Sequence, residues 1–259
     1  MSESTFVREN CMANVLEARR LQFGYTGVEN AFAAEFDFDL KAGEVVALMG
    51  ENGCGKTTLL KVFAGLLPPL SGSVAICGKD VYDRTNGWSL LDLSKKVSLV
   101  RMSVPPPDRM TVREFVGLGR TPYSGILDGR SAEDERVIAE SMRLLDVEKF
   151  AKRPVAELSD GERTRVYLAE AVAQQVDVML LDEPNAFLDI PRSHALFRTL
   201  KELAASRKMG VVVSTHSIEY AERYADRIMV VNGGRVRVSP AGSARADGLL
   251  DWASCNAST

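Results

Sequence analysis

One segment of eight residues limits what this chain can fold into more than any other feature of its sequence. It has the pattern GxxxxGK[ST] and consists of Gly50, Glu51, Asn52, Gly53, Cys54, Gly55, Lys56 and Thr57. A nearly continuous apolar run at 44–49 precedes it, and a helical pattern at 57–67 follows and stops at two prolines. Glycines let successive N–H groups point at phosphate oxygens, and a helix N-terminus favours an anion. The segment therefore predicts a phosphate-binding loop between a buried strand and a helix.

The two residues that end this pattern define the ligand further. Lys56 supplies a full positive charge for the β- and γ-phosphates of a nucleotide, and the Thr57 hydroxyl is a ligand for Mg²⁺. Thr58 follows directly and belongs to the same set of nucleotide-binding residues. The loop thus predicts ATP and Mg²⁺ as the bound species.

A second motif places two carboxylates directly after an apolar run. The run at 178–181 ends in Asp182 and Glu183, and the carboxyl end of a parallel strand faces the ligand crevice. Asp182 is expected to hold Mg²⁺ through a water, and Glu183 to polarise the attacking water as general base. A lone pair of acids at a strand end is as often a solvated terminus, but its combination with the phosphate-binding loop favours catalysis.

The order of apolar runs predicts an α/β fold with a mainly parallel sheet, because helical patterns lie between the runs. Strand-like runs lie at 44–49, 72–81, 96–100, 178–181, 210–214 and 228–231. Residues 36–40 alternate apolar and polar, which is typical of an antiparallel strand near the N-terminus. Capping-box patterns at Thr111 and Ser131 begin helices of an inserted helical lobe.

These patterns suggest one folded domain with short ends. We expect a flexible N-terminal tail at 1–14, a domain at 15–240 with a helical subdomain at about 83–175, and a short C-terminal tail at 241–259. The cysteines at 11, 54, 77 and 255 fit no metal-binding spacing and are expected to be free thiols.

Charge and hydropathy exclude two classes of function. The net charge is −3 and no polybasic run occurs, so a primary nucleic-acid role has no electrostatic support. No apolar stretch approaches the roughly 18 residues of a spanning helix, and the first residues lack the hydrophobic core of a signal peptide. The protein is expected to be cytoplasmic, with any membrane association supplied by a partner.

A third motif points to a family. Leu158-Ser159-Asp160-Gly161-Glu162 resembles the LSGGQ signature of ABC ATPases and precedes an amphipathic helix. Alone it could be an ordinary capped helix start, but it lies shortly before the strand that ends in paired acids. From about residue 16 to residue 237 the chain is similar to the ATP-binding subunits of ABC transporters. This resemblance implies a P-loop NTPase core, an N-terminal antiparallel β part and an inserted α-helical lobe.

The resemblance also implies roles for further residues. ABC ATP-binding subunits form head-to-tail dimers, with each ATP between the phosphate-binding loop of one copy and the signature of the other. Carried onto this chain, Ser159 and Gly161 contact the partner's γ-phosphate, and Glu162 belongs to the same set of nucleotide-binding residues. Asp189 in Leu188-Asp189 lines the dimer interface and is included in that set. His216 corresponds to the histidine that contacts the γ-phosphate and the attacking water, although a lone histidine after a strand is usually structural.

Tyr25 corresponds to the aromatic residue that stacks on adenine, with an ordinary core position as the alternative. The chain also departs from the family. Met102 stands where a glutamine that senses Mg²⁺ and couples to the membrane partner is expected, and a thioether is a poor ligand for a hard cation. Asp160 and Glu162 replace the glycine and glutamine of the signature, and Ser217 follows His216 where an aspartate is frequent.

The segment 111–123 is similar to the helical lobe of importer ATPases for iron-siderophores, haem and cobalamin. This likeness implies a homodimer docked on transmembrane permease subunits at the inner face of the cell membrane, with a substrate-binding protein upstream. Two alternatives stay open. One is a soluble ABC ATPase of an assembly or repair machine without a permease. The other is an ATP-binding module that hydrolyses weakly, as Met102 and the altered signature suggest.

Overall fold

A computed structural model describes residues 14–24, 34–83, 85–106, 108–123 and 129–254 of this chain. Tyr25 and all but the last residue of the expected N-terminal tail lie outside the described residues. Asn14, the last residue assigned to that tail, already begins strand β1. None of the described helices has the length and apolar character needed to cross a membrane.

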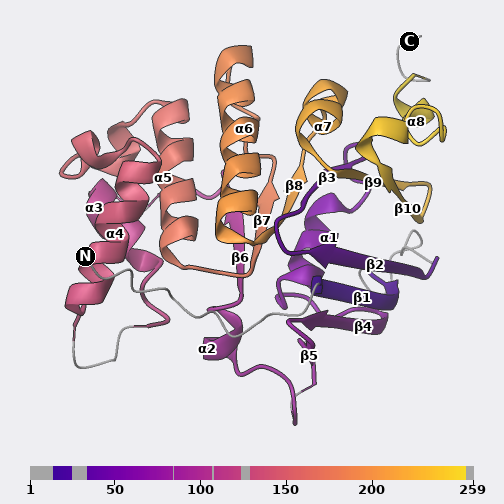
Figure 1. Ribbon diagram of the computed structural model, residues 1–259, viewed down its shortest axis with the longest axis horizontal. Coiled ribbons are helices and arrows are strands. Elements are labelled where there is room, and N and C mark those ends of the chain that lie inside the picture. The colour runs from indigo at the N-terminus through magenta and orange to yellow at the C-terminus, as the bar shows by residue number, and fades with distance from the viewer. Residues whose placement is uncertain (1–13, 25–33, 84, 107, 124–128, 255–259) are drawn as a thin grey trace.

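A six-stranded sheet forms the centre of the molecule (Figure 1). Its strands, in spatial order, are β10 (Arg235–Pro240), β9 (Arg227–Asn232), β3 (Val45–Met49), β8 (Gly210–Ser214), β7 (Val178–Asp182) and β6 (Val97–Arg101). All neighbours pair in parallel except β9 and β10, which form an antiparallel hairpin. The central strands β3 and β8 are buried along their whole length, as strands covered on both faces are. The predicted mainly parallel α/β sheet is confirmed.

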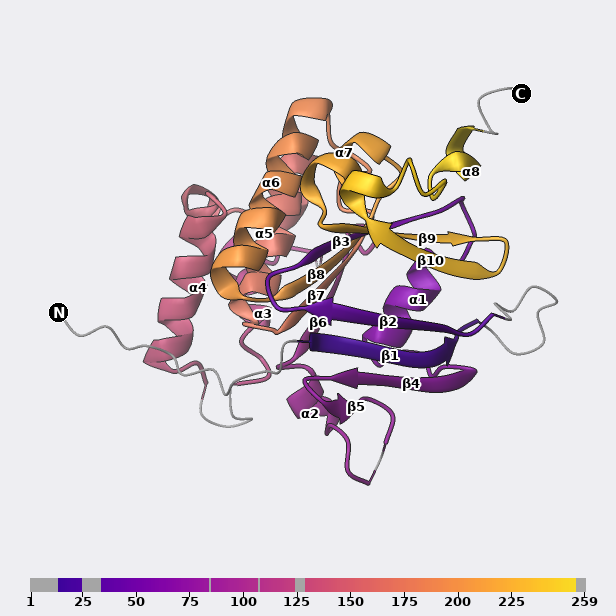
Figure 2. The same cartoon turned by 45° about the vertical axis from the view of Figure 1, so that its right-hand side comes forward.

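A second sheet of four antiparallel strands packs beside it (Figure 2). Its strands, in spatial order, are β2 (Phe36–Lys41), β1 (Asn14–Gln22), β4 (Ser71–Ile76) and β5 (Lys79–Asp80). The expected N-terminal antiparallel part is thus confirmed. The single strand expected at 72–81 is wrong, because Cys77 and Gly78 have φ values of 48° and 78° and turn the chain into a hairpin. Cys77 is also disulfide-bonded, which corrects the expectation of a free thiol there.

Helices cover both faces of the large sheet (Figure 1). The α-helices are α1 (Lys56–Phe63), α2 (Leu90–Leu93), α3 (Val112–Leu118), α4 (Ala132–Leu144), α5 (Asp160–Ala173), α6 (Ile190–Arg207), α7 (Ile218–Tyr224) and α8 (Asp251–Ser254), and the 3₁₀ turns are η1 (Glu148–Phe150), η2 (Val155–Glu157) and η3 (Ala241–Ser243). Helix α1 lies between the two sheets, where its buried Leu59 and Phe63 join the core that both sheets share. This packing fixes the end of β3 and the start of α1 relative to each other.

Helices α3, α4 and α5 pack together as a lobe on the other side of the sheet (Figure 1). Thr111 and Ser131 cap α3 and α4 with capping boxes, as predicted. Inside the lobe, the buried Arg120 donates to Asp134 at 2.8 Å and to the Ala173 carbonyl at 2.8 Å, so one guanidinium joins α4 to the end of α5. Strand β6 falls within the range expected for this lobe but belongs to the large sheet.

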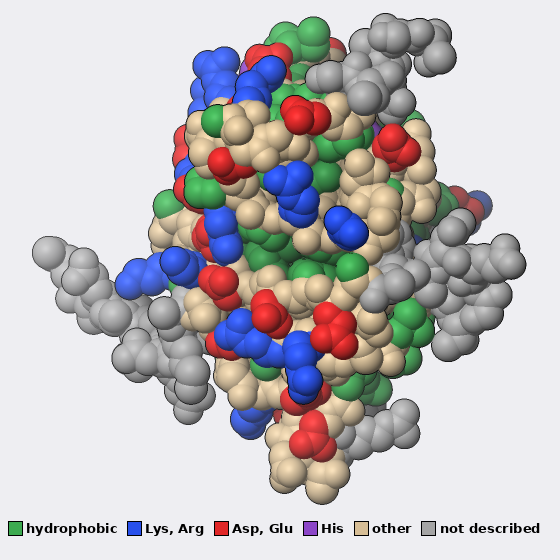
Figure 3. Space-filling view, turned by 90° about the vertical axis from the view of Figure 1, so that its right-hand side faces the viewer, with side chains coloured by type: hydrophobic (Ala, Val, Ile, Leu, Met, Phe, Trp, Pro, Cys, Tyr) green, Lys and Arg blue, Asp and Glu red, His purple; other side chains and the backbone are tan. Residues whose placement is uncertain are grey.

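The segment after β10 folds back instead of forming a tail. Ala241, Ala244, Leu249 and Leu250 are buried against β3, β9 and α7 in a third core cluster. The described part of the expected 241–259 tail is thus attached to the domain, because these small and apolar side chains pack against β3, β9 and α7. On the face shown in Figure 3, cationic and anionic side chains of the described residues are interspersed.

Candidate functional site

The predicted phosphate-binding loop joins the end of β3 to the start of α1. Gly50, Gly53 and Gly55 have φ values of 146°, 77° and 103°, which side chains disfavour. At Gly50 there is also no space, because a Cβ atom there would lie 2.3 Å from the carbonyl oxygen of Val231. The loop therefore needs glycine at these positions for its backbone path. Cys54 is a free thiol within it, and burial raises the pKa of this thiol.

Lys56 lies beneath the loop with its ammonium group directed at the loop's own backbone. Its Nζ atom donates to the carbonyl oxygens of Gly50 and Glu51, each at 3.0 Å, and only 6% of the residue is exposed. No carboxylate pairs with this ammonium group among the ion pairs of the described residues. A buried positive charge that is held only by carbonyl oxygens is suited to receive an anion such as a phosphate.

Thr57 and Asp182 bring the loop and strand β7 together. The Thr57 hydroxyl donates to Asp182 Oδ2 at 2.8 Å, and the Ser214 hydroxyl of β8 donates to Asp182 Oδ1 at 3.0 Å. Hydroxyl and carboxylate oxygens are the hard ligands that Mg²⁺ prefers, with phosphates and waters completing the shell. Among the described residues, no group of three or more His, Cys, Asp or Glu side chains could hold a metal ion. Thr57 and Asp182 therefore fit the predicted Mg²⁺ site.

Glu183 and His216 meet beside this site. His216 Nε2 lies 2.8 Å from Glu183 Oε1, and both side chains are more than 40% exposed. Glu183 has a φ of 50°, an unusual backbone conformation for a residue with a side chain, and its N–H donates to the Ser214 hydroxyl at 2.8 Å. The carboxylate is thus directed toward solvent and the histidine, where a water molecule can reach it.

Ser214 is the residue that the sequence analysis missed. It is fully buried, and its hydroxyl links the two acids by accepting from Glu183 and donating to Asp182. The available signal was a small polar residue at the carboxyl end of an otherwise apolar strand, two residues before His216. Ser214 in β8 pairs with Leu48 in β3, and this pairing places Ser214 next to the phosphate-binding loop that follows β3.

The signature residues form a separate group at the start of α5. The Glu162 carboxylate accepts from the Ser159 hydroxyl at 2.8 Å and from the Ser159 N–H at 2.9 Å. These two hydrogen bonds lower the pKa of Glu162, so the side chain stays ionised. Asp160 forms an ion pair with Arg163 of the same helix, which turns its charge toward that partner. The glutamate that replaces the family's glutamine therefore serves as a helix cap here.

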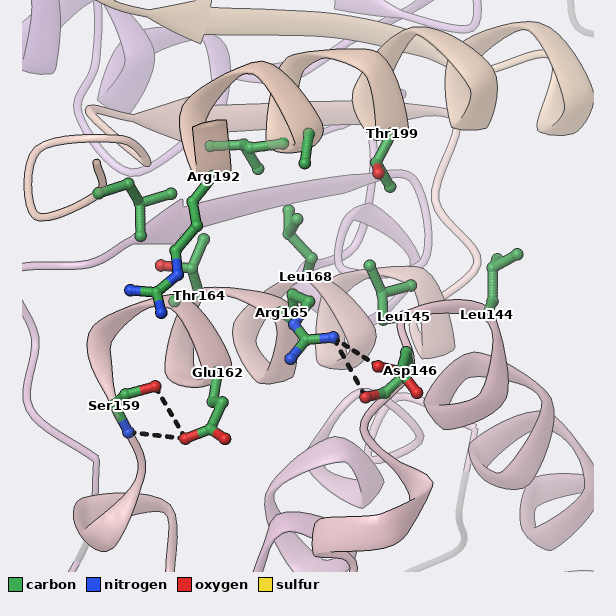
Figure 4. A pocket seen from close by; sticks show the side chains of 14 residues that line it. Leu144, Leu145, Asp146, Ser159, Glu162, Thr164, Arg165, Leu168, Arg192 and Thr199 are labelled. Carbon is green, nitrogen blue, oxygen red and sulfur yellow. Dashed lines mark hydrogen bonds and ion pairs between the residues drawn. The ribbon is translucent and has the colours of Figure 1, made fainter. Parts of the chain in front are cut away.

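A cavity of about 410 Å³ separates this group from α6 (Figure 4). Ser159, Gly161 and Glu162 line one wall, and Leu188 and Arg192 line the other. Asp189 caps α6 by accepting from the Arg192 N–H at 2.9 Å. The structure thus places the predicted signature and Asp189 on adjoining helix starts.

The predicted site residues therefore fall into two groups. In the first group, the phosphate-binding loop and the first turn of α1, which includes Thr58, contact Asp182 through Thr57, and Glu183 and His216 lie beside Asp182. The second group lies at the starts of α5 and α6 and consists of Ser159, Gly161, Glu162 and Asp189. Tyr25 lies outside the described residues. Met102 follows β6 and packs against the core between the sheet and the lobe, so its thioether is used as an apolar group.

Comparisons with known proteins agree with this geometry. Residues 33–186 match the family described as ABC transporter. The chain is 35% identical over 217 residues to the achromobactin transport ATP-binding protein CbrD of Dickeya dadantii, covering 84% of this chain and 78% of that protein. It is 39% identical over 215 residues to the hemin import ATP-binding protein HmuV of Streptomyces coelicolor, covering 83% and 74%.

A solved structure extends the likeness to the fold. An inward-facing conformation of a metal-chelate type ABC transporter superimposes with a TM-score of 0.79 at 25% identity, covering 93% of this chain and 89% of that one. The matched family spans more than half of the chain, and it includes the phosphate-binding loop, the signature and both acids. The chain is therefore a member of the ABC transporter family.

Proposed function

We propose that this chain binds MgATP and hydrolyses it as the nucleotide-binding subunit of an ABC importer. The observation that supports this most is the convergence of Lys56, Thr57, Asp182, Glu183 and His216 from three elements far apart in the sequence. A buried ammonium group, a hydroxyl–carboxylate pair and a solvent-facing carboxylate next to a histidine are the groups that phosphoryl transfer to water requires.

Each of these residues has a definite task in that reaction. The Lys56 ammonium exchanges its two carbonyl partners for oxygens of the β- and γ-phosphates, and the loop N–H groups bind the same phosphates. Thr57 and Asp182 hold Mg²⁺, which neutralises charge on the phosphates when it is bound. Glu183 accepts the proton of the attacking water, and His216 holds that carboxylate and the water in position.

The signature group is proposed to act on the nucleotide of a second copy. Ser159 and Gly161 lie at the start of α5, beside Asp189 at the start of α6, whereas the residues proposed to bind this copy's own triphosphate belong to the other group. Phe187 and Ile190 flank this region and are 63% and 67% exposed, so two large apolar side chains are available to a partner. A head-to-tail homodimer would cover these side chains and complete two equivalent sites.

The proposed partners and cargo rest on relatives. Proteins named for achromobactin transport, hemin import, cobalamin import and petrobactin import are similar to this chain over most of its length. By that similarity we propose docking on two permease subunits at the cytoplasmic face of the membrane, a substrate-binding protein upstream, and an iron chelate, haem or a related metal chelate as cargo.

The test is ATP turnover by the purified chain, compared with Glu183→Gln. The wild type is expected to release phosphate in a Mg²⁺-dependent manner. The amide cannot accept the proton, so the variant should lose turnover, keep ATP binding and accumulate as an ATP-bound dimer on size-exclusion chromatography with light scattering. Undiminished hydrolysis by Glu183→Gln would refute the assignment of the base. Wild-type binding without turnover would favour the alternative of a weakly hydrolysing module.

A further inference from the structure

The cavity between α5 and α6 contains two guanidinium groups with different surroundings (Figure 4). Arg165 is held at one end by Asp146, whose carboxylate accepts at 2.9 Å and whose carbonyl accepts at 3.3 Å. Arg192 lies at the other end, where α5 begins. Among the described residues, its one ion pair joins Nη1 to Asp189 Oδ2 at 3.6 Å, longer than a hydrogen bond. Of the two, Arg192 therefore keeps more capacity to bind an anion.

The stem of Arg192 lies directly over Gly161. A Cβ atom built on Gly161 would be 2.9 Å from Cδ, 3.3 Å from Nε and 3.7 Å from Cζ of Arg192. Figure 4 shows the side chain extending from α6 toward the first turn of α5. Its side chain is 60% exposed, so its donors can reach a ligand that arrives at the signature from outside.

The signature of this chain carries two carboxylates, Asp160 and Glu162, at the start of α5. Asp160 forms an ion pair with Arg163, whereas Glu162 accepts hydrogen bonds from the Ser159 hydroxyl and N–H; these bonds, with smaller contributions from the nearby charges of Arg153 and Arg165, lower the pKa of Glu162. The Ser159 hydroxyl is also occupied by that carboxylate. The Glu162 carboxylate thus lies on the surface that is proposed to meet a triphosphate, where its negative charge opposes binding.

We propose that Arg192 is a phosphate-binding residue of the signature surface, contacting the terminal phosphate of the ATP bound by a second copy of this chain. This inference rests on the proposed function. The guanidinium offsets the charge of Glu162 and adds forked N–H donors beside the Gly161 backbone. The start of α6 therefore shares the phosphate-binding role that is proposed for the signature at the start of α5.

The experiment measures ATP-dependent dimerisation in the Glu183→Gln background, with Arg192→Gln or Arg192→Lys added. Arg198→Gln is the matched control, because Arg198 is an exposed arginine six residues further along α6 and does not line the cavity. Light scattering gives the ATP concentration at half-maximal dimer. Fluorescent ATP at low protein concentration gives the affinity of the monomer's own loop, and thermal unfolding checks the fold.

Loss of a charged hydrogen bond to phosphate should raise the half-maximal ATP concentration for Arg192→Gln by about tenfold or more. Arg192→Lys should recover part of the loss, since it restores the charge. Monomer affinity and melting temperature should match those of the Arg198→Gln control. An unchanged ATP requirement in Arg192→Gln, or an equal loss in monomer affinity, would overturn this inference alone. Failure of the Glu183→Gln parent to dimerise with ATP would instead overturn the proposed homodimer and this inference with it.

Discussion

Replacing Ser214 by alanine tests how the two acids are held in place. The Ser214 hydroxyl accepts from the Glu183 N–H at 2.8 Å and donates to Asp182 Oδ1 at 3.0 Å, with no exposure to solvent. Alanine leaves a backbone donor and a carboxylate oxygen without this partner. Each unsatisfied buried group costs about 1–3 kcal/mol. Since both acids lie at the rim of the site and regain some water contact, we expect the unfolding free energy to fall by about 2 kcal/mol.

The same change should affect turnover more than binding. Glu183 has a φ of 50°, a backbone conformation that costs about 1 kcal/mol or more. Contacts with the surrounding residues, such as the hydrogen bond to Ser214, offset this cost. Without the bond to Ser214 the carboxylate moves relative to the attacking water, and misplacement of about an ångström can lower kcat a hundredfold. We therefore expect kcat to fall at least tenfold in Ser214→Ala, while KM for ATP changes little because Lys56 and its loop stay intact.

The assays are urea unfolding and steady-state phosphate release. Ser98→Ala provides the control, because Ser98 is a buried serine in β6 of the same sheet, only 6% exposed, whose side chain links no catalytic group. Its effect on stability should be smaller and its turnover normal. Wild-type kcat in Ser214→Ala, or a stability loss no larger than that of Ser98→Ala, would refute the role assigned to this hydroxyl.

Two further predictions concern Met102 and Glu170. Met102→Gln should change permease-stimulated ATPase activity more than basal ATPase activity. The reason is that the amide restores a polar group at the position where the family couples the nucleotide site to the membrane partner. Equal effects on the two activities would contradict this prediction. It should also lower stability by about 1 kcal/mol, since Met102 packs on the core. Burial raises the pKa of Glu170 from 4.5 to about 7, so the folded protein favours the protonated carboxyl. The contribution of this carboxyl to the unfolding free energy is therefore complete below pH 4.5 and is lost as the pH rises to about 7. Glu170→Gln should therefore reduce the fall in unfolding free energy between pH 5 and pH 8 by about 2 kcal/mol, and an unchanged pH profile in denaturant titrations would show that this carboxyl is not responsible.

Features encoded by short segments could be predicted from the sequence. The phosphate-binding loop, the paired acids at the end of β7 and the caps at Thr111 and Ser131 each depend on residues close together in the chain. Strands β3 and β8 were found because burial on both faces leaves a continuous apolar run. The family pattern then indicated that Lys56 and Asp182 share one site.

Features that depend on distant contacts could not be predicted. The turn at Cys77 interrupts a run with strand-like composition, and only the pairing of β4 with β5 shows the hairpin. Leu249 and Leu250 are isolated apolar residues in the sequence, and their burial requires the surface formed by β9 and α7. The link from Ser214 to both acids and the contact of Arg192 with Gly161 likewise join elements whose spacing the sequence does not specify.

The central claim is that a buried ammonium group and a hydroxyl–carboxylate pair together bind a magnesium–triphosphate. Calorimetric titration of ATP into the purified chain tests it most directly, with Mg²⁺, with a chelator in place of Mg²⁺, and with Lys56→Ala. The account predicts saturable binding of one nucleotide per chain that weakens at least tenfold without Mg²⁺ and again in Lys56→Ala. Equal affinity in all three titrations, or no binding by the wild type, would contradict it.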